Sequence, residues 1–174
     1  HNVILEIIWT ILPSIILIAI AIPSFKLLYA QDEVINPLLT VKAIGQQWYW
    51  GYEITDINKG EIIFDSYAIS DSELEKGTIR LLDVDNPLYL PILTPIRLLT
   101  TSIDVIHSFA VPSFGVKIDA IPGRINHANI LILREGIYYG QCSELCGQMH
   151  YNMPIVINAI SPSSYLSWLS NNIL

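Results

Sequence analysis

All the sulfur atoms of the chain lie in one short segment. Cys142 and Cys146 are four residues apart, His150 follows after four more, and Met153 after a further three. Thiolate, imidazole and thioether are the ligands of blue-copper electron-transfer sites, in which a Cys, a His and a Met often share a loop between strands. The segment therefore predicts a copper-binding loop, and His107 is the upstream histidine that would complete it.

The second cysteine decides whether such a loop holds one copper ion or two. If both thiolates bridge a pair of copper ions, each ion keeps one terminal histidine, and Met153 and a main-chain carbonyl become weak axial ligands. An electron added to this unit is spread over two metals and two sulfurs, so its bond lengths change little. A small change in geometry allows fast electron transfer with little driving force. The residue types thus suit a dinuclear electron-transfer centre.

Two other uses of the same residues remain open. Two Cys and two His are a ligand set for structural zinc, although such sites usually take both histidines from one short segment, and His107 and His150 are far apart. A disulfide between Cys142 and Cys146 would suit an oxidising compartment, but it gives the neighbouring His and Met no role. The remaining histidines are interpreted as surface residues.

The composition indicates a membrane-bound protein. Of the 174 residues 52% are hydrophobic and 14% are charged, and Ile7 to Phe25 form a run of 19 without a charged side chain. A run of about 20 apolar residues crosses a bilayer as a helix, so one crossing is expected here rather than a buried core helix or a signal segment. Pro13 and Pro23 would bend that helix, which is tolerated where membrane helices pack together. The net charge of -7 argues against nucleic acid as a partner.

Beyond residue 36 the sequence changes to short β-prone runs separated by turns, two of which are Asn58–Gly60 and Ile121–Gly123. Many strands at this spacing, without helices between them, are typical of an antiparallel sandwich or barrel. The expected strands are Leu39–Ile44, Trp48–Ile54, Ile62–Tyr67, Thr78–Val84, Ile96–Thr101, Ala128–Leu133 and Gly136–Gly140.

The chain thus divides into residues 1–33, with the membrane helix and its flanks, and residues 34–174, with the β-domain. Ser161 followed by Pro162 predicts the cap and the first residue of a short helix near the C-terminus. A chain of this length has little room for an elaborate active site of its own. We therefore expect it to work with partner chains and to catalyse nothing alone.

Several blocks of residues, in order along nearly the whole chain, resemble subunit II of the haem-copper cytochrome c oxidases. A lone pair of cysteines four residues apart would be weak support, but the blocks extend far beyond the sulfur cluster. They are Ile8–Pro13, Gly45–Trp50, Arg80–Asn86, Asp104–Ser113, Asp119–Arg124, Tyr138–Glu144 and Met153–Val156.

This resemblance implies a fold and a metal centre. The fold is an all-β, cupredoxin-like Greek-key sandwich or barrel with one N-terminal transmembrane helix and a short C-terminal helix. The metal centre is the dinuclear copper A of the family. Its ligands would be His107 and His150 at the two ends, Cys142 and Cys146 as bridges, and Met153 and the main-chain oxygen of Glu144 as axial donors.

Two more roles follow from the resemblance. The carboxylate of Glu144 would bind a magnesium ion shared with subunit I. Trp48 matches the position at which electrons from cytochrome c reach the subunit. Without the family, Trp48 and Trp50 would be interpreted as residues on one face of a strand, with at least one in the core.

Four acidic residues match the positions that attract cytochrome c in the family. Charges of this kind mainly raise the rate of encounter, and salt weakens their effect. Outside the family context each would be an ordinary solvated carboxylate. The four are Glu53, Asp56, Asp85 and Asp104.

The family also implies a location and partners. The chain would lie in the mitochondrial inner membrane with its copper domain in the intermembrane space, passing electrons from cytochrome c to haem in subunit I of a proton-pumping enzyme with further subunits. Family members usually have two membrane helices, and this sequence begins just before the second, so either a separate chain supplies the first or that segment was removed. Phe109 stands where the family usually has Trp, and Gln46 where His is common, but neither is a ligand position.

Membrane-tethered copper chaperones of thioredoxin fold are an alternative of a different class, since they also combine a CxxxC with a distant histidine. In those proteins the CxxxC comes early, before a helix, and the histidine follows it. Here His107 precedes the cysteines and Met153 follows them. The order of the ligands therefore favours the oxidase subunit.

Overall fold

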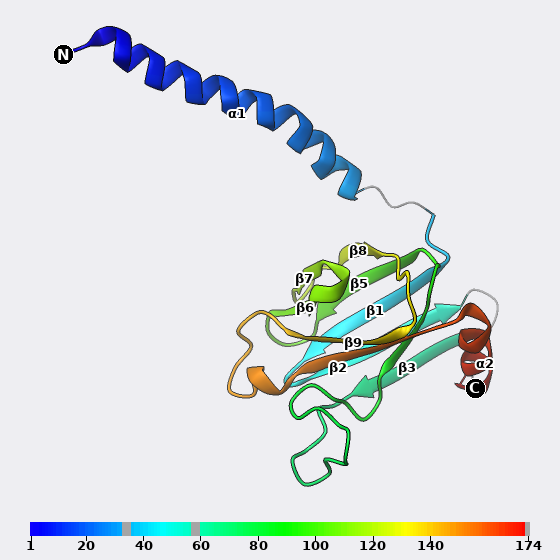
Figure 1. Ribbon diagram of the computed structural model, residues 1–174. Helices are drawn as coiled ribbons and strands as arrows, with labels where there is room; N and C mark the ends of the chain where they lie inside the picture. Colours follow the sequence, from blue (N-terminus) through cyan, green and yellow to red (C-terminus); the bar gives the residue numbers. More distant parts are fainter. Residues whose placement is uncertain (33–35, 57–59, 173–174) are drawn as a thin grey trace. The chain divides into compact units, whose positions relative to one another are not determined.

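The computed structural model describes most of the chain (Figure 1). The turn predicted at Asn58 and the division predicted between residues 33 and 34 lie outside the described part. The described residues are 1–32, 36–56 and 60–172.

Helix α1, Val3–Asp32, makes up most of the first compact unit, His1–Ile35. It is 30 residues long and contains Pro13 and Pro23. At about 1.5 Å per residue it extends about 45 Å, more than the roughly 30 Å of a bilayer's hydrocarbon core. Its most apolar window has a mean hydropathy of 2.5 and is 0% buried. The helix thus has the length and composition to cross a membrane, and it lacks the burial of a core helix.

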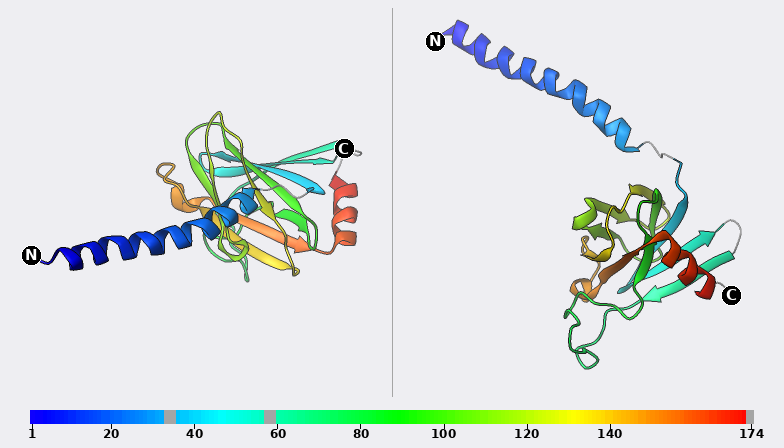
Figure 2. Two further views of the ribbon diagram at one scale, coloured as in Figure 1. Left: turned by 90° about the horizontal axis from the view of Figure 1, so that it is seen from above. Right: turned by 45° about the vertical axis from the view of Figure 1, so that its right-hand side comes forward.

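The second unit, Asn36–Leu174, is a β-sandwich whose described residues form two five-stranded sheets (Figures 1 and 2). The strand orders are β3-β2-β1-β5-β8 and β4-β10-β9-β6-β7. This confirms the predicted all-β fold and differs from a thioredoxin fold. The strands of the first sheet are β1 (Leu39–Gln46), β2 (Tyr49–Asp56), β3 (Gly60–Ser66), β5 (Ile96–Ser102) and β8 (Asn126–Ile130). Those of the second are β4 (Leu88–Pro91), β6 (His107–Val111), β7 (Val116–Ala120), β9 (Gly136–Cys142) and β10 (Pro154–Ile160).

Two pairs of neighbouring strands run parallel, so the sandwich is not antiparallel throughout as predicted. β1 pairs with β5, and β4 pairs with β10, in parallel register. Parallel neighbours need a long connection rather than a tight turn. The chain makes these connections through strands that lie between the partners in sequence.

The strand predicted at Thr78–Val84 is wrong, because residues 80–82 form a turn and Val84 makes only an isolated bridge with Ala68. The carbonyl oxygen of Ile79 accepts the N–H groups of Leu82 and Asp83, both at 3.0 Å. The Asp83 carboxylate in turn accepts the N–H of Ile79 at 2.5 Å. A short acidic side chain that binds nearby backbone competes with pairing into a sheet.

The predicted C-terminal helix is present as α2, Pro162–Asn172. The hydroxyl of Ser161 accepts the N–H of Ser164 at 3.2 Å and so caps the first turn. Tyr165 and Leu169 face the sandwich and are buried. The helix therefore closes one side of the core (Figure 2).

Alternate side chains of the strands fill the space between the sheets. Trp50, Tyr52 and Ile54 of β2 are almost fully buried, as the two-residue repeat of a strand requires. Phe109 of β6 meets the Trp50 ring edge-on, with centroids 5.2 Å apart. Phe109, which differs from the usual family residue, is thus a core residue that links the two sheets.

Three connections meet at one end of this sandwich, namely the β1–β2 turn, the β5–β6 loop and the β9–β10 loop. The N–H of Ile103, in the β5–β6 loop, donates to the carbonyl of Gly45 at 3.3 Å. The carboxamide of Gln47, in the β1–β2 turn, donates to the carbonyl of Cys146, in the β9–β10 loop, at 2.8 Å. All the predicted ligands lie in or beside these connections.

Gly140 of β9 lies tightly against β6, which yields a test of the fold. A Cβ there would overlap the carbonyl oxygen of Ala110 and lie 2.9 Å from a methyl group of Val111. Gly140→Ala should therefore lower the free energy of unfolding of the β-domain by about 3 kcal/mol. Denaturant unfolding of the full chain in detergent, followed by near-ultraviolet circular dichroism, measures this loss.

Gly51→Ala is the matched control on the other sheet. Its Cβ would meet the ends of flexible side chains, those of Asp65 at 3.2 Å and Gln46 at 3.3 Å. These can move, so the loss should be within about 1 kcal/mol. Equal losses in the two variants would contradict the packing of β9 on β6.

Candidate metal centre

Two free thiols lie side by side inside the domain. Cys142 ends β9 and Cys146 follows in the β9–β10 loop, with 7% and 3% of their surfaces exposed. Their Sγ atoms are 3.9 Å apart, whereas a disulfide holds sulfurs about 2.05 Å apart. The N–H of Cys142 donates to the carbonyl of Met153 at 3.1 Å, which closes the loop at its base. The structure therefore presents two thiols and not the alternative disulfide.

His107, the first residue of β6, faces the first thiol. Its side chain is fully buried, and its Nδ1 atom lies 3.9 Å from Sγ of Cys142. The ligand atoms of His107, Cys142 and Cys146 all lie within 4.8 Å of one another. Gly45 leaves room for this ring, because a Cβ there would lie 2.7 Å from Cδ2 of His107.

His150 faces the second thiol. It begins the 3-10 helix η2, His150–Asn152, and its Nδ1 atom lies 3.4 Å from Sγ of Cys146. The donors thus follow one another as imidazole, sulfur, sulfur and imidazole. His150 does not belong to the group of ligand atoms within 4.8 Å of one another. A single tetrahedral zinc ion would need four mutually close donors, so the arrangement suits two ions better than one.

One of the two predicted axial donors lies beside a thiol. The main-chain oxygen of Glu144 is 3.4 Å from Sγ of Cys142, while the Glu144 side chain is exposed. Met153, the other predicted axial donor, is 1% exposed, and its main-chain carbonyl accepts the N–H of Cys142. A weak carbonyl donor is therefore present at the site, and the backbone of Met153 is hydrogen-bonded to that of Cys142.

Burial and mutual proximity give the two thiols different acidities. Burial opposes ionisation of Cys142, but hydrogen bonds with His107 and with the main chain lower its pKa to about 6. Burial and the neighbouring Cys142 charge raise the pKa of Cys146 to about 12. Of the two thiols, Cys142 is therefore the one that ionises more readily. A bound cation would release the second proton, because coordination deprotonates a thiol.

Asp104 holds the His107 ring from the other side. One carboxylate oxygen lies 2.8 Å from Nε2 of His107, and the other accepts the N–H of Gln47 at 2.6 Å. Burial opposes ionisation of Asp104, but hydrogen bonds from His107 and the main chain lower its pKa overall. A carboxylate on one ring nitrogen favours the proton there and leaves the other nitrogen free for a metal. The ring of His107 is thus oriented with Nδ1 towards the thiols.

Trp48 and Gln47 both contact the loop that carries the second thiol. The indole N–H of Trp48 and the carboxamide of Gln47 donate to the same carbonyl, that of Cys146, at 3.2 and 2.8 Å. Sequence reasoning predicted a role for Trp48 but missed Gln47 and the contact of Asp104 with His107. No spacing rule signals these contacts, since Gln47 and Cys146 are 99 residues apart.

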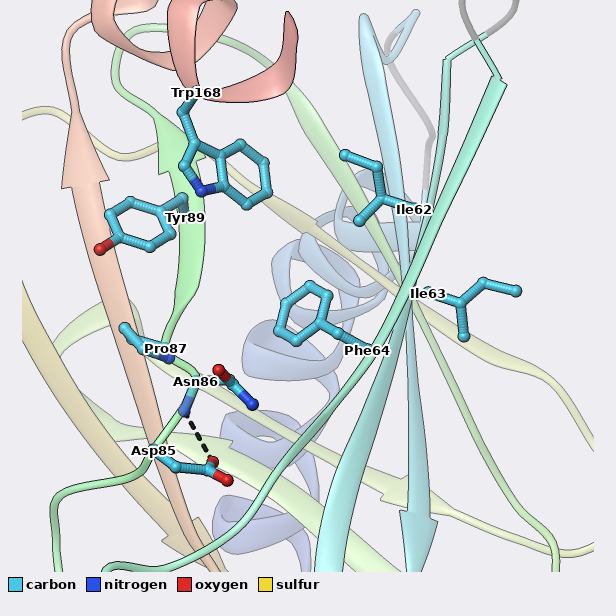
Figure 3. Close-up of a pocket in the computed structure, with 8 residues that line it drawn as sticks. All are labelled: Ile62, Ile63, Phe64, Asp85, Asn86, Pro87, Tyr89 and Trp168. Atoms are coloured by element: carbon cyan, nitrogen blue, oxygen red, sulfur yellow. Dashed lines mark hydrogen bonds between the residues drawn. The ribbon is translucent and has the colours of Figure 1, made fainter. Parts of the chain in front are cut away.

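Two of the other predicted docking acids, Glu53 and Asp85, are not part of the metal-binding cluster. Glu53 forms an ion pair with Lys42 at 2.7 Å, with side chains 25% and 30% exposed. Asp85 lines an open hollow of about 400 Å³ next to β3 and α2 (Figure 3), and its carboxylate accepts the N–H of Asn86 at 2.6 Å. The side chain of Asp56 lies outside the described part of the chain.

The family "Cytochrome C oxidase subunit II, periplasmic domain" matches residues 39–160, and "Cytochrome C oxidase subunit II, transmembrane domain" matches residues 1–27. Cytochrome c oxidase subunit 2 of Pneumocystis carinii is 55% identical, over 98% of this chain and 72% of the relative. That of Arabidopsis thaliana is 56% identical, over 100% and 68%.

A solved structure is similar as well. The crystal structure of the periplasmic domain of subunit II of cytochrome oxidase of Bradyrhizobium japonicum has a TM-score of 0.72 and 44% identity, and the match covers 80% of this chain and 96% of that one. The sequence matches extend over both units, and the structural match is to a periplasmic domain. The chain therefore belongs to the cytochrome c oxidase subunit II family.

Proposed function

We propose that the chain is the electron-input subunit of a cytochrome c oxidase, receiving electrons from cytochrome c at a dinuclear copper A centre and delivering them to haem in subunit I. One observation supports this most directly. Two buried free thiols lie 3.9 Å apart, and each faces an imidazole of its own. Soft sulfur donors with imidazoles at both ends are suited to a copper pair.

The residues present fit such a centre. When bound, the copper pair supplies a one-electron redox centre whose charge is shared by two metals and two sulfurs. His107 and His150 would hold its ends, and Cys142 and Cys146 would bridge it. The buried strands around the thiols exclude water, and Asp104 keeps the His107 ring in place. The protein thus holds its ligands in position before and after an electron arrives.

Cytochrome c would dock near Trp48, the half-buried aromatic residue that contacts the Cys146 peptide. The net charge of -7 favours a basic partner. Glu53, Asp56 and Asp85 are the docking acids we propose besides Asp104. Asp104 would then act both in docking and in orienting His107.

The same proposal covers the surroundings of the subunit. The exposed carboxylate of Glu144 would bind a magnesium ion shared with subunit I, since its main-chain oxygen already lies at the thiols. The β-domain would face the intermembrane space of mitochondria.

Copper loading tests the centre itself. The full chain in detergent should bind two copper ions and give the electron paramagnetic resonance of one electron shared by two copper nuclei. Cys142→Ser and His107→Ala should lose that signal, whereas His127→Ala, which removes an exposed imidazole on β8, should keep it. The spectrum of a single copper nucleus in the unmodified chain, or a preference for zinc, would exclude the proposal.

Removal of the Asp104 carboxylate tests the support of His107. Asp104→Ala should weaken copper binding by about 10- to 100-fold, because the ring loses the partner that orients it. Asp104→Asn keeps an oxygen acceptor and should recover much of the affinity, and Asp85→Ala should leave it unchanged. Competition with a chelator measures these affinities. Equal affinity in Asp104→Ala and the unmodified chain would leave Asp104 with a docking role alone.

Trp48→Phe tests the path of the electron. The variant keeps an aromatic ring but loses the indole N–H that binds the Cys146 carbonyl. We expect oxidation of cytochrome c to slow far more than its binding weakens, as measured by stopped-flow kinetics. Binding should weaken as salt shortens the Debye length to about 10 Å at 0.1 M. A loss of binding as large as the loss of rate would indicate a structural role for Trp48, and indifference to salt would contradict acidic docking.

A further inference from the structure

Gln47, in the β1–β2 turn, is hydrogen-bonded to both the β5–β6 loop, which precedes His107, and the β9–β10 loop, which carries Cys146. Its main-chain N–H donates to Asp104 at 2.6 Å, and Asp104 holds the ring of His107. Its side-chain amide donates to the carbonyl of Cys146 at 2.8 Å. Gln47 thus connects the β5–β6 loop, next to His107, with the β9–β10 loop, called the cysteine loop below, although the two are far apart in sequence.

The same carbonyl also accepts the indole N–H of Trp48, at 3.2 Å. A carbonyl oxygen has two lone pairs, so both donors can bind it at once. The Gln47 amide therefore fixes the position of the acceptor that Trp48 uses. Gly147, with φ of 120°, allows this close approach, because a Cβ there would lie 3.1 Å from the Gln47 amide nitrogen and 3.2 Å from Cζ2 of Trp48.

We propose that Gln47 is a positioning residue for electron transfer from Trp48, an inference that rests on the proposed function. It holds the Cys146 peptide against the indole N–H, so that a continuous path of covalent bonds and one hydrogen bond joins the indole to Sγ of Cys146. Electronic coupling falls much more steeply across a gap in space than along bonds. Loss of the Gln47 amide would loosen that one hydrogen bond and weaken the coupling.

The chemistry of the side chain explains why an amide is needed at this position. Glutamate would bring a carboxylate, which has no hydrogen to donate, towards the Cys146 carbonyl. Methionine has a similar length and no donor. Gln47 is exposed, so its replacement should leave the core intact.

Gln46 offers a matched control one residue away. Its carboxamide oxygen accepts the hydroxyl of Tyr49 at 2.5 Å, within the same turn. Gln46→Met therefore makes the same chemical change without removing a donor to the Cys146 carbonyl. Any effect specific to Gln47→Met must come from its contact with the cysteine loop.

The first experiment needs no metal. The full chain in detergent contains four Trp indoles, and Trp48→Phe assigns the Trp48 indole N–H in the proton spectrum. We expect solvent exchange of that proton to become about fivefold faster in Gln47→Met, as the loss of one typical hydrogen bond implies, and to stay unchanged in Gln46→Met. Unchanged exchange in Gln47→Met would overturn the proposal.

The second experiment uses the copper-loaded chain and reduced cytochrome c. Gln47→Met should lower the rate constant of electron transfer within the complex by about the same fivefold factor, with the dissociation constant and the copper spectrum unchanged. A fall in affinity without a fall in that rate constant would overturn the positioning role. If the unmodified chain takes up no copper or accepts no electron, the proposed function fails, and the exchange experiment still decides whether Gln47 positions Trp48.

Discussion

The main physical constraint on the site is that the Sγ atoms of Cys142 and Cys146 are buried only 3.9 Å apart. In such a low-dielectric setting two negative charges repel strongly, so the pKa of Cys142 is lowered by its hydrogen bonds while that of Cys146 is raised by burial and by the Cys142 charge. A soft cation removes that conflict. The neighbouring groups supply further ligands without further charge, since His107 and His150 are imidazoles and Glu144 offers a main-chain oxygen.

The two halves of the site are held by different means. The ladder between β6 and β9 pairs Phe109 with Cys142 and so fixes the first histidine and the first thiol. The second thiol lies on a loop, where hydrogen bonds from the β1–β2 turn fix its peptide. A rigid ladder on one side and a hydrogen-bonded loop on the other explain why residues outside the ligand set matter to the centre.

The ligand types and the fold class were predictable because both depend on local patterns. The spacing of the Cys, His and Met residues predicted the ligand-bearing loop, and the apolar run predicted α1. This helix extends further than predicted because helical structure continues past the apolar residues. Thr78–Val84 was mispredicted because backbone contacts of Asp83 outweigh β propensity. The strands β4, β6, β7 and β10 were not predicted, nor were the contacts of Gln47 and Asp104, because pairing between distant segments leaves no periodic signal.

The pairing of β1 with β5 also affects the order of biogenesis. Strand β1 is made early, but each of its residues pairs with one in β5 that is made 57 residues later, as in the pair of Leu39 and Ile96. The groups that shape the centre extend from Gly45 to Met153, so a nascent polypeptide cannot assemble the site until almost all of it has left the ribosome. The complete set of predicted ligands therefore exists only after Met153 has been made, and a metal ion that used all of them would bind late in the folding of the β-sandwich.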